Sequence, residues 1–458
     1  MGVTRRLVEF LLRTNFDQMP TEVVLRAKEL ILDTIGVALA GSIQPPAEIA
    51  IDYVRHLGGN PQATIIGRGF KTTAPNVALA NGISAAALDY DDTNFIMVAH
   101  TSGSVLPAVL ALGEELGASG QDILEAYILG YEVGGKVARG IQPAQYIRGC
   151  HATGTLGIIC CVAACIKLAK LGPQEATNAF GIAGSLACGL RGNFGSMTKP
   201  FHSGTAAMNS IVAVSLAKRG FTAGSTIFEH PYGYCMVTTG KEQVQLRAIE
   251  EALDSPVWAL VDPGVGVKLH PCNSAVLPGI DSTIEIVKEH DIKPDQVESI
   301  DYGTTSLAID IARFNEPKTS PEAMYSITHA VAVSVVDRKA GISQFTEERV
   351  RDPVVRSLVG KVKSYVHPDL KDVTDPHDIP ASYVTIKLKN GQEFTKYRRR
   401  PRAYPGGDSI SRDDLVEKYR ECAGLVLPSQ NIDASIALLD KLETVPHIGE
   451  LIGLLSTT

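Results

Sequence analysis

The first half of the chain arranges apolar and polar residues with the period of an α-helix. One segment has Thr21 where a helix N-cap belongs and Gly41 where a C-terminal glycine belongs. The apolar positions between them recur at helical spacing: Val24, Ala27, Ile31, Ile35 and Ala38. From residue 4 to about 220 the pattern predicts helix after helix, with further helices near 46–57, 73–88, 104–117, 121–139, 152–171, 174–190 and 201–219.

The pattern changes after about residue 265, where stretches rich in β-branched and aromatic residues predict strands. We expect these strands at 297–306, 360–367, 383–389 and 392–397. The last two flank Asn390-Gly391, which is typical of a two-residue hairpin turn. Helical patterns near 274–290 and 320–338 lie between the strands, so this part of the chain predicts an α+β unit.

The 458 residues exceed what one hydrophobic core normally serves. From Ser411 the pattern returns to helix, which indicates that the α+β unit is inserted into a helical one. We therefore predict a mainly α protein with two domains. A large all-helical domain is built from both chain ends, 1–265 and 408–458, and a smaller α+β lid domain spans 266–407.

Composition narrows the class of protein. Hydrophobic residues make up 45% of the chain and charged residues 20%, with a net charge of −7, which argues against a nucleic-acid partner. The uncharged stretch 152–166 falls short of the ~20 apolar residues that cross a bilayer, and Glu9 and Arg13 interrupt any signal-type segment. We expect no membrane span and a cytoplasmic location. The eight cysteines include no Cys-x-x-Cys pair, which indicates reduced core residues.

Three segments place a basic side chain just before a predicted helix, or in its first turn, among small residues. They are Asp89-Tyr-Asp-Asp-Thr93 with His100, Arg148-Gly-Cys-His151, and Lys199-Pro-Phe-His202. Free backbone N–H groups and the positive end of the helix dipole favour an anion at such a position. Three converging helix ends would form a pocket for carboxylates.

A fourth segment places Lys268 and His270 where the second domain begins. A cleft between the domains would gather the basic groups of all four segments: His100, His151, Lys199, His202, Lys268, Arg148 and Arg191. Like-charge repulsion in such a cluster lowers the pKa of each Lys and His, which suits proton transfer near neutral pH. This chemistry needs no metal and no cofactor.

Simpler interpretations stand beside this one. A single His before a helix is more often a cap or a packed core group than a catalyst, and Asp89, Asp91 and Asp92 would serve equally as helix caps. Cys161 and Cys165 could share a helix face, but no second ligand pair completes a zinc site. The chain has neither a Gly-x-Gly-x-x-Gly nor a Walker pattern, and no Gly-x-Ser-x-Gly elbow, which argues against a nucleotide site and a serine nucleophile.

The same segments carry a resemblance that runs along the whole chain. It rests on Asp-Tyr-Asp-Asp-Thr, His-x-Ser-x-x-Val-Leu-Pro, His-x-Thr-x-Thr-Leu-Gly, Thr-Lys-Pro-x-His-x-Gly-x-Ala-Ala and Lys-x-x-Pro-Cys. In order and spacing these motifs resemble the MmgE/PrpD family, which contains 2-methylcitrate dehydratases, cis-aconitate decarboxylases and an iminodisuccinate epimerase. The resemblance implies a large helical domain from both chain ends, a smaller α+β lid and a homodimer.

The resemblance also implies roles for individual residues. The positions that match the family's active site are Asp89, Thr93, His100, His151, Lys199 and Lys268. The lysines and the threonine would hold substrate carboxylates, and the histidines would move protons to and from the carbon beside one of them. Further substrate contacts are expected from His202, Arg148, Arg191 and His270.

We rank a cofactor-independent lyase first: a dehydratase or decarboxylase of a small di- or tricarboxylate, acting by proton transfer at the carbon next to a carboxylate. An epimerase of a dicarboxylate such as iminodisuccinate ranks second, and a non-catalytic carboxylate-binding protein third. Animal-type cis-aconitate decarboxylases carry a further His where this chain has Asn273, and a lid Tyr for which this chain has Leu307 or no clear counterpart. Both differences count against that particular decarboxylation. The expected partner is a small polycarboxylate, and no metal is expected.

Overall fold

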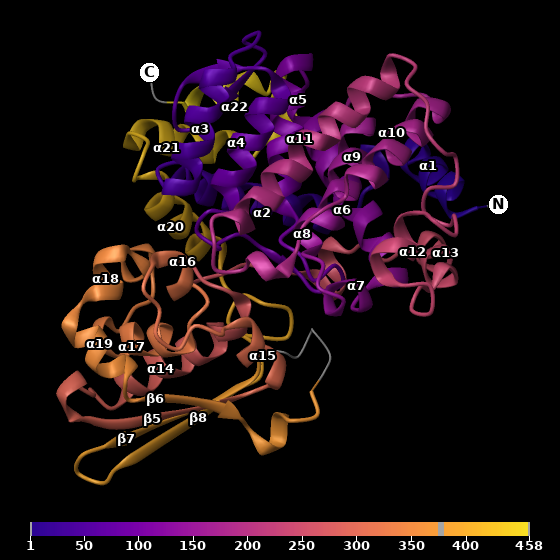
Figure 1. Ribbon diagram of the computed structural model, residues 1–458. Helices are drawn as coiled ribbons and strands as arrows, with labels where there is room; N and C mark the ends of the chain where they lie inside the picture. Colours follow the sequence, from indigo (N-terminus) through magenta and orange to yellow (C-terminus); the bar gives the residue numbers. More distant parts are fainter. Residues whose placement is uncertain (1, 374–379, 457–458) are drawn as a thin grey trace.

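The computed structural model describes residues 2–373 and 380–456, and it is mainly α-helical (Figure 1). The helical body begins with α1 (Val3–Arg13), α2 (Thr21–Gly41), α3 (Pro45–Leu57), α4 (Ala74–Ala86), α5 (Ser102–Leu116) and α6 (Gly120–Ile141). It continues with α7 (Ala144–Ile147), α8 (Ala152–Thr155), α9 (Gly157–Leu168), α10 (Pro173–Leu186), α11 (Thr198–Lys218), α12 (Tyr234–Thr239) and α13 (Leu246–Asp254). These helices confirm the expected helical segments, except that the one at 152–171 is divided into α8 and α9.

The ends of α2 differ from the prediction. Pro20 is the N-cap, and Thr21 is the first helical residue, whose side chain caps nothing. At the other end Gly41 is the last helical residue. A Cβ at this position would lie 1.9 Å from the carbonyl oxygen of Ser84, so only glycine fits there. The glycine serves close packing of α2 against α4 and not a left-handed helix end.

Two short antiparallel pairs join loops of the body. They are β1 (Ala63–Ile65) with β2 (Phe70–Thr72), and β3 (Thr93–Asn94) with β4 (Val265–Gly266). The second pair matters for the site, because it fixes the segment after α4 beside the segment that leads into the lid. Among the described helices, none is long and apolar enough to span a membrane.

The lid carries a four-stranded sheet with the order β6 (Val362–Val366), β5 (Val297–Thr304), β7 (Ser382–Leu388) and β8 (Glu393–Arg398). β5 and β6 are parallel, and the other neighbours are antiparallel. The expected hairpin is confirmed, with Gly391 at a φ of 85° in its turn. Along β7, Val384, Ile386 and Leu388 are buried whereas the residues between them are partly exposed, as expected for a sheet with one covered face.

Helices lie over that face of the sheet (Figure 1). α14 (Leu277–Glu289), α15 (Ser306–Ile311) and α17 (Ile327–Asp337) contact the strands. Farther from the sheet lie α16 (Ser320–Ala323), α18 (Glu347–Arg351) and α19 (Pro353–Val359), which pack on other lid helices. The helix expected at 320–338 is divided into α16 and α17 by the residues 324–326. This break brings Tyr325 to the site described below.

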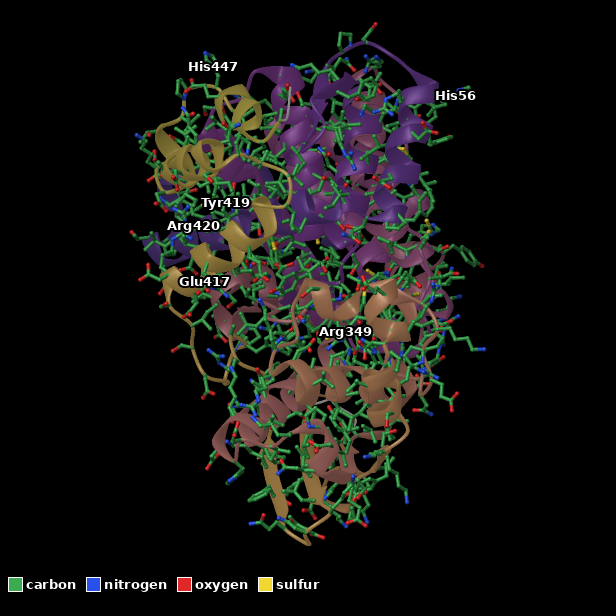
Figure 2. All side chains as sticks on the ribbon, turned by 90° about the vertical axis from the view of Figure 1, so that its left-hand side faces the viewer. His56, Arg349, Glu417, Tyr419, Arg420 and His447 are labelled. Atoms are coloured by element: carbon green, nitrogen blue, oxygen red, sulfur yellow. The ribbon has the colours of Figure 1, made fainter. Side chains whose placement is uncertain are left out.

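The tail returns to the body as α20 (Arg412–Ala423), α21 (Ser429–Leu439) and α22 (Gly449–Leu454). Figure 2 shows Tyr419 and Arg420 on α20, above Arg349 of the lid. Tyr419 packs over Gly36 of α2, and the neighbouring Glu421 forms an ion pair with Lys339 of the lid at 2.9 Å. The tail therefore contacts both parts. The predicted domain boundaries stay a prediction.

Candidate active site

Asp89 lies at the centre of a buried ion-pair group. Its Oδ1 is 2.9 Å from Nζ of Lys199, in the first turn of α11, and 2.5 Å from Nζ of Lys268, just after β4. Lys268 also donates to the backbone carbonyl of Asp89 at 2.9 Å. Burial alone would raise the pKa of Asp89, but the two ammonium groups hold it well below its usual range. Two positive charges thus share one carboxylate.

The backbone of Asp89 is unusual. Its φ is 47°, in the left-handed region that costs a non-glycine residue free energy and is often found at functional sites. Lys418 of α20 braces this segment by donating to the carbonyls of Tyr90 and Lys268 at 3.1 and 2.8 Å. Lys418 also forms a buried ion pair with Asp33 at 2.7 Å. The tail helix therefore holds together the two segments that supply Asp89 and Lys268.

His100 lies just before α5, largely buried beside the same carboxylate. Its Nδ1 is 2.8 Å from the carbonyl oxygen of Asp92, so this nitrogen is assigned the proton. Its Nε2, 3.7 Å from Oδ1 of Asp89, then presents a lone pair. Burial, followed by the charge of Lys268, lowers the pKa of His100 to about 4. The imidazole is neutral at physiological pH and can accept a proton.

Asp92 is a helix-capping residue, as one interpretation of the sequence held. Its carboxylate accepts from the backbone N–H of Ser102 at 3.1 Å and from the Tyr131 hydroxyl at 2.6 Å. Through these hydrogen bonds the side chain of Asp92 holds the start of α5, and with it His100, in place. Burial raises the pKa of Asp92 to about 7.

A cluster of three hydroxyl groups lies next to His100. The hydroxyl of Thr93 is 3.2 Å from that of Ser274 and 3.4 Å from Nδ1 of His100. Tyr404 donates to Thr93 at 3.1 Å and lies 2.9 Å from Ser274. Thr93 belongs to β3, Ser274 to the start of the lid, and Tyr404 to the segment that returns from the lid to the body. Hydroxyl groups at such a junction are suited to bind carboxylate oxygens.

His151 is the N-cap residue of α8 and pairs with a second histidine. Its backbone N–H donates to the carbonyl of Gly189 at 3.0 Å, and its Nδ1 lies 2.9 Å from Nδ1 of His202. Burial, followed by the charge of Lys199, lowers the pKa of His151 well below its usual range and that of His202 to about 4. Gly154 permits this arrangement, since a Cβ there would lie 2.3 Å from the carbonyl oxygen of Cys188.

A cavity opens between the body and the lid at these residues. Its walls combine two of the three hydroxyls with His100, His151 and aromatic groups, and they include Thr93, His100, Tyr146, His151, Phe194, Asn273, Ser274 and Tyr325. A second cavity reaches the ion-pair group and is lined by Asp89, Lys199, Gly195, Met197 and again Tyr325. Tyr325 thus stands between the two, and burial together with the Asp89 carboxylate raises its pKa well above the ordinary value.

The structure brings most predicted residues together and separates the rest. Arg148 is exposed and turned toward Gly240, because the short helix α7 ends there and points it outward. His270 faces the interior of the lid, where it contacts the carbonyl of Ala340 at 2.9 Å and Asp281 at 3.2 Å. Neither Arg148 nor His270 is among the described residues that line the two cavities, so their expected substrate contacts stay a prediction that this placement does not support.

Arg191 and His202 lie behind the cavity wall. The guanidinium of Arg191 stacks 4.1 Å over the ring of Tyr146 and forms an ion pair with Asp310 at 3.4 Å. His202 contacts His151 and is not among the cavity residues. The expected cause of the lowered histidine pKa is also corrected: burial has the largest effect, and Asp89 neutralises part of the lysine charge.

Sequence reasoning missed Tyr146, Ser274, Tyr325 and Tyr404. The sequence prediction relied on basic residues at predicted helix starts, and none of these four residues is next to a basic residue at a helix start. Tyr404 is also 311 positions away from its partner Thr93 in the sequence. Ser274 directly follows Asn273 beyond the Lys-x-x-Pro-Cys motif, so closeness to that motif could have found it.

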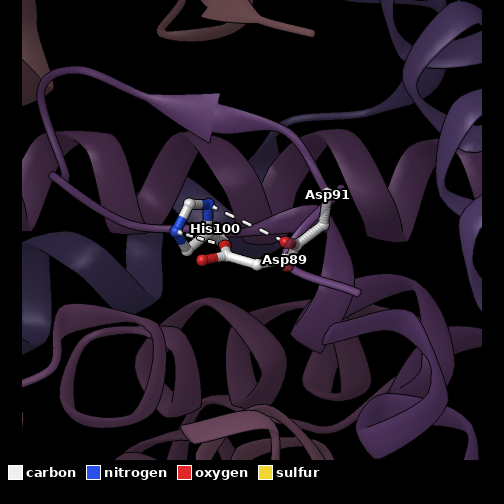
Figure 3. Close-up of side chains that lie close together, drawn as sticks. All are labelled: Asp89, Asp91 and His100. Carbon is white, nitrogen blue, oxygen red and sulfur yellow. Dashed lines mark ion pairs between the residues drawn. The ribbon is translucent and has the colours of Figure 1, made fainter. Parts of the chain in front are cut away.

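Within the described residues, Asp89, Asp91 and His100 have ligand atoms close enough to share a metal ion (Figure 3). Asp91 is fully buried, and neither of its carboxylate oxygens accepts a hydrogen bond from the described part of the chain. However, the ammonium groups of Lys199 and Lys268 already contact Asp89. A divalent cation there would face two positive charges, so the geometry fits ion pairing better than metal binding.

Comparison with known proteins agrees with this architecture. The MmgE/PrpD N-terminal domain matches residues 5–247, and the MmgE/PrpD C-terminal domain matches residues 270–444. The cis-aconitate decarboxylase of Mus musculus is 28% identical over 94% of this chain and 89% of its own. Those of Homo sapiens and Aspergillus terreus are 27% and 25% identical, over 94% and 99% of this chain and 90% and 96% of theirs. The chain belongs to the MmgE/PrpD family.

Proposed function

We propose that this protein is a cofactor-independent lyase that acts on a small di- or tricarboxylate by proton transfer at the carbon next to a carboxylate. The observation that carries the proposal is one cavity lined by two neutral histidines, His100 and His151, together with the hydroxyls of Thr93 and Ser274. A histidine that is neutral near pH 7 can accept a proton, and the hydroxyls can donate to a carboxylate.

The two ammonium groups support an anionic substrate. Lys199 and Lys268 both contact Asp89, and the carboxylate of Asp91 lies in the same buried group. The ammonium of Lys199, which lines the second cavity, can attract a carboxylate and stabilise the enolate-like charge that forms when a proton leaves the adjacent carbon. Loss of a β-hydroxyl from that state gives a dehydratase, and protonation coupled to loss of carbon dioxide gives a decarboxylase.

The relatives favour a tricarboxylate substrate, since three of them are named cis-aconitate decarboxylases. Asn273 argues against assigning the same decarboxylation of cis-aconitate to this protein. Its amide is engaged within the lid, donating to the carbonyl of Met324 at 3.1 Å and accepting from the N–H of Ala275 at 2.9 Å. An amide in this position holds the chain and transfers no proton. We therefore place the dehydratase and the decarboxylase together as the first candidate.

An epimerase is the second candidate, because the same two histidines approach one cavity from different elements. One of them would remove a proton, and the other would return a proton to the opposite face of the carbon. The two reactions leave different products, so one experiment separates them.

Proton NMR in deuterated water tests the proposal, with citrate, 2-methylcitrate, cis-aconitate, tartrate, malate and iminodisuccinate as substrates. A lyase releases water or carbon dioxide from at least one acid, whereas an epimerase only incorporates deuterium with inversion. The His151→Ala variant serves as the control that loses the reaction. If no acid reacts but several raise the thermal midpoint, the protein binds carboxylates without turnover and the proposal is wrong.

A further inference from the structure

The pair formed by His151 and His202 has a feature that substrate binding does not explain. The two Nδ1 atoms face each other at 2.9 Å, with both side chains nearly fully buried, at 2% and 5% exposure. Only His151 lines the cavity. His202 lies behind it, on α11, next to the segment that contains the exposed Cys188. The pair therefore lies between the cavity and this exposed segment.

A hydrogen bond between two Nδ1 atoms fixes the protonation of both rings. One Nδ1 must carry a hydrogen and the other must present a lone pair, so the rings cannot both be cations. Lys199, His100 and Asp89 are the other charged or titratable groups near the pair, and burial with the Lys199 charge disfavours imidazolium at both rings. Each ring is therefore neutral, and the tautomer of one sets the tautomer of the other.

We propose that His202 is a positioning residue that selects the tautomer of His151 and relays its proton between the cavity and solvent. This inference rests on the proposed function and adds a residue that acts through His151. The described residues provide no hydrogen-bond partner for Nε2 of His202, and the relay requires this nitrogen to exchange protons with water.

The relay conserves protons and charge. In the starting state His151 carries a hydrogen on Nδ1 and His202 on Nε2. When Nε2 of His151 takes a proton from the substrate carbon, its Nδ1 hydrogen passes to Nδ1 of His202, and Nε2 of His202 gives its hydrogen to water. Both rings end neutral with exchanged tautomers, and one proton has moved from substrate to solvent. Delivery of a proton to the substrate runs the same exchange in reverse.

Two substitutions separate the relay from simple packing. In His202→Asn the amide can still hydrogen-bond to Nδ1 of His151 but cannot pass a proton on, whereas His202→Phe removes both properties. With an acid that the wild type converts, we expect kcat of His202→Asn to fall at least tenfold, KM to stay within twofold and deuterium exchange at the substrate carbon to slow in parallel. His56→Asn, an exposed residue labelled in Figure 2, is the control. A kcat within twofold of wild type for His202→Asn would overturn the relay.

A second measurement does not depend on turnover. Nitrogen-15 spectra of histidine-labelled protein at pH 7 should show two neutral rings that share one Nδ1 hydrogen, and this signal should vanish in His202→Phe. Spectra with both rings protonated only at Nε2 would overturn the inference whatever the activity. If the shared hydrogen is present and no acid of the panel reacts, the proposed function fails and the pairing stands.

Discussion

Nζ of Lys199 lies 2.9 Å from Oδ1 of Asp89, and both side chains are almost fully buried. The lysine comes from the first turn of α11 and the aspartate from the loop after α4, 110 positions earlier. A buried ion pair of this kind is weak evidence for stability, since desolvation offsets much of the attraction. Because both residues line the second cavity, we expect the pair to serve the proposed reaction.

Replacing Lys199 by Met is expected to lower kcat/KM by about 100-fold or more, which corresponds to ~2.7 kcal/mol of transition-state stabilisation. The reason is the loss of a positive charge that lines the second cavity. Lys218→Met on the same helix is the matched control, because Lys218 is exposed at the far end of α11. Steady-state kinetics would contradict the assignment if Lys199→Met kept kcat/KM within threefold of wild type.

Replacing Asp89 by Asn should destabilise the fold, because two buried ammonium groups lose their only carboxylate partner in this group. Removal of one partner from a buried pair costs about 3–5 kcal/mol. Urea unfolding measures the change, with Asp291→Asn as the control, since Asp291 is exposed and has a similar positive φ of 47°. Equal midpoints for the two variants would show that the lysines are compensated elsewhere.

Lys418 and Asp33 should behave as a coupled pair in a double-mutant cycle. Lys418→Met alone leaves the buried Asp33 without its ion-pair partner at 2.7 Å and releases the carbonyls of Tyr90 and Lys268, so we expect a loss of about 3–5 kcal/mol. Adding Asp33→Asn should restore part of that loss. Additive effects of the two substitutions in unfolding experiments would exclude the coupling.

The buried histidines should contribute a loss of stability in acid, which the raised pKa of Asp92 opposes, so their effect is measured by comparing variants. The pKa of His100 and that of His202 are lowered to about 4, below the ordinary value near 6.5 that applies in the unfolded chain. Below pH 6.5 the unfolded state therefore binds more protons, and the stability present above that pH is lost as the pH falls toward 4. Unfolding at pH 7 and pH 5 should differ less for His100→Gln than for wild type, whereas His56→Gln should match wild type. An unchanged difference for His100→Gln would contradict the lowered pKa.

Chelators should leave turnover unchanged. The reason is that the ammonium groups of Lys199 and Lys268 contact Asp89, the central member of the only described group with metal-ligand spacing. Dialysis against EDTA followed by the NMR assay measures this. Loss of activity that Mg²⁺, Mn²⁺ or Zn²⁺ restores would identify Asp89, Asp91 and His100 as a metal site instead.

The sequence by itself determined the helices, the lid strands and the segments that carry the site. Helical spacing, the Asn390-Gly391 turn and the return to helix after Ser411 are local patterns, and local patterns report local structure. The motifs also predicted that Asp89, His100, His151, Lys199 and Lys268 belong to one site, because the order of the motifs matches that of a known family. Element boundaries were less certain, as the ends of α2 show.

Only the tertiary structure decided what each of these residues touches. The carboxylate of Asp89 is shared by lysines 110 and 179 positions away, and Tyr325 enters the site through a break between two short helices. Arg148 and His270 belong to motifs that reach the site, yet their side chains point elsewhere because the local backbone turns them away. Contacts of such long sequence separation depend on how whole helices pack, and burial, which sets the pKa of the histidines, exists only after packing.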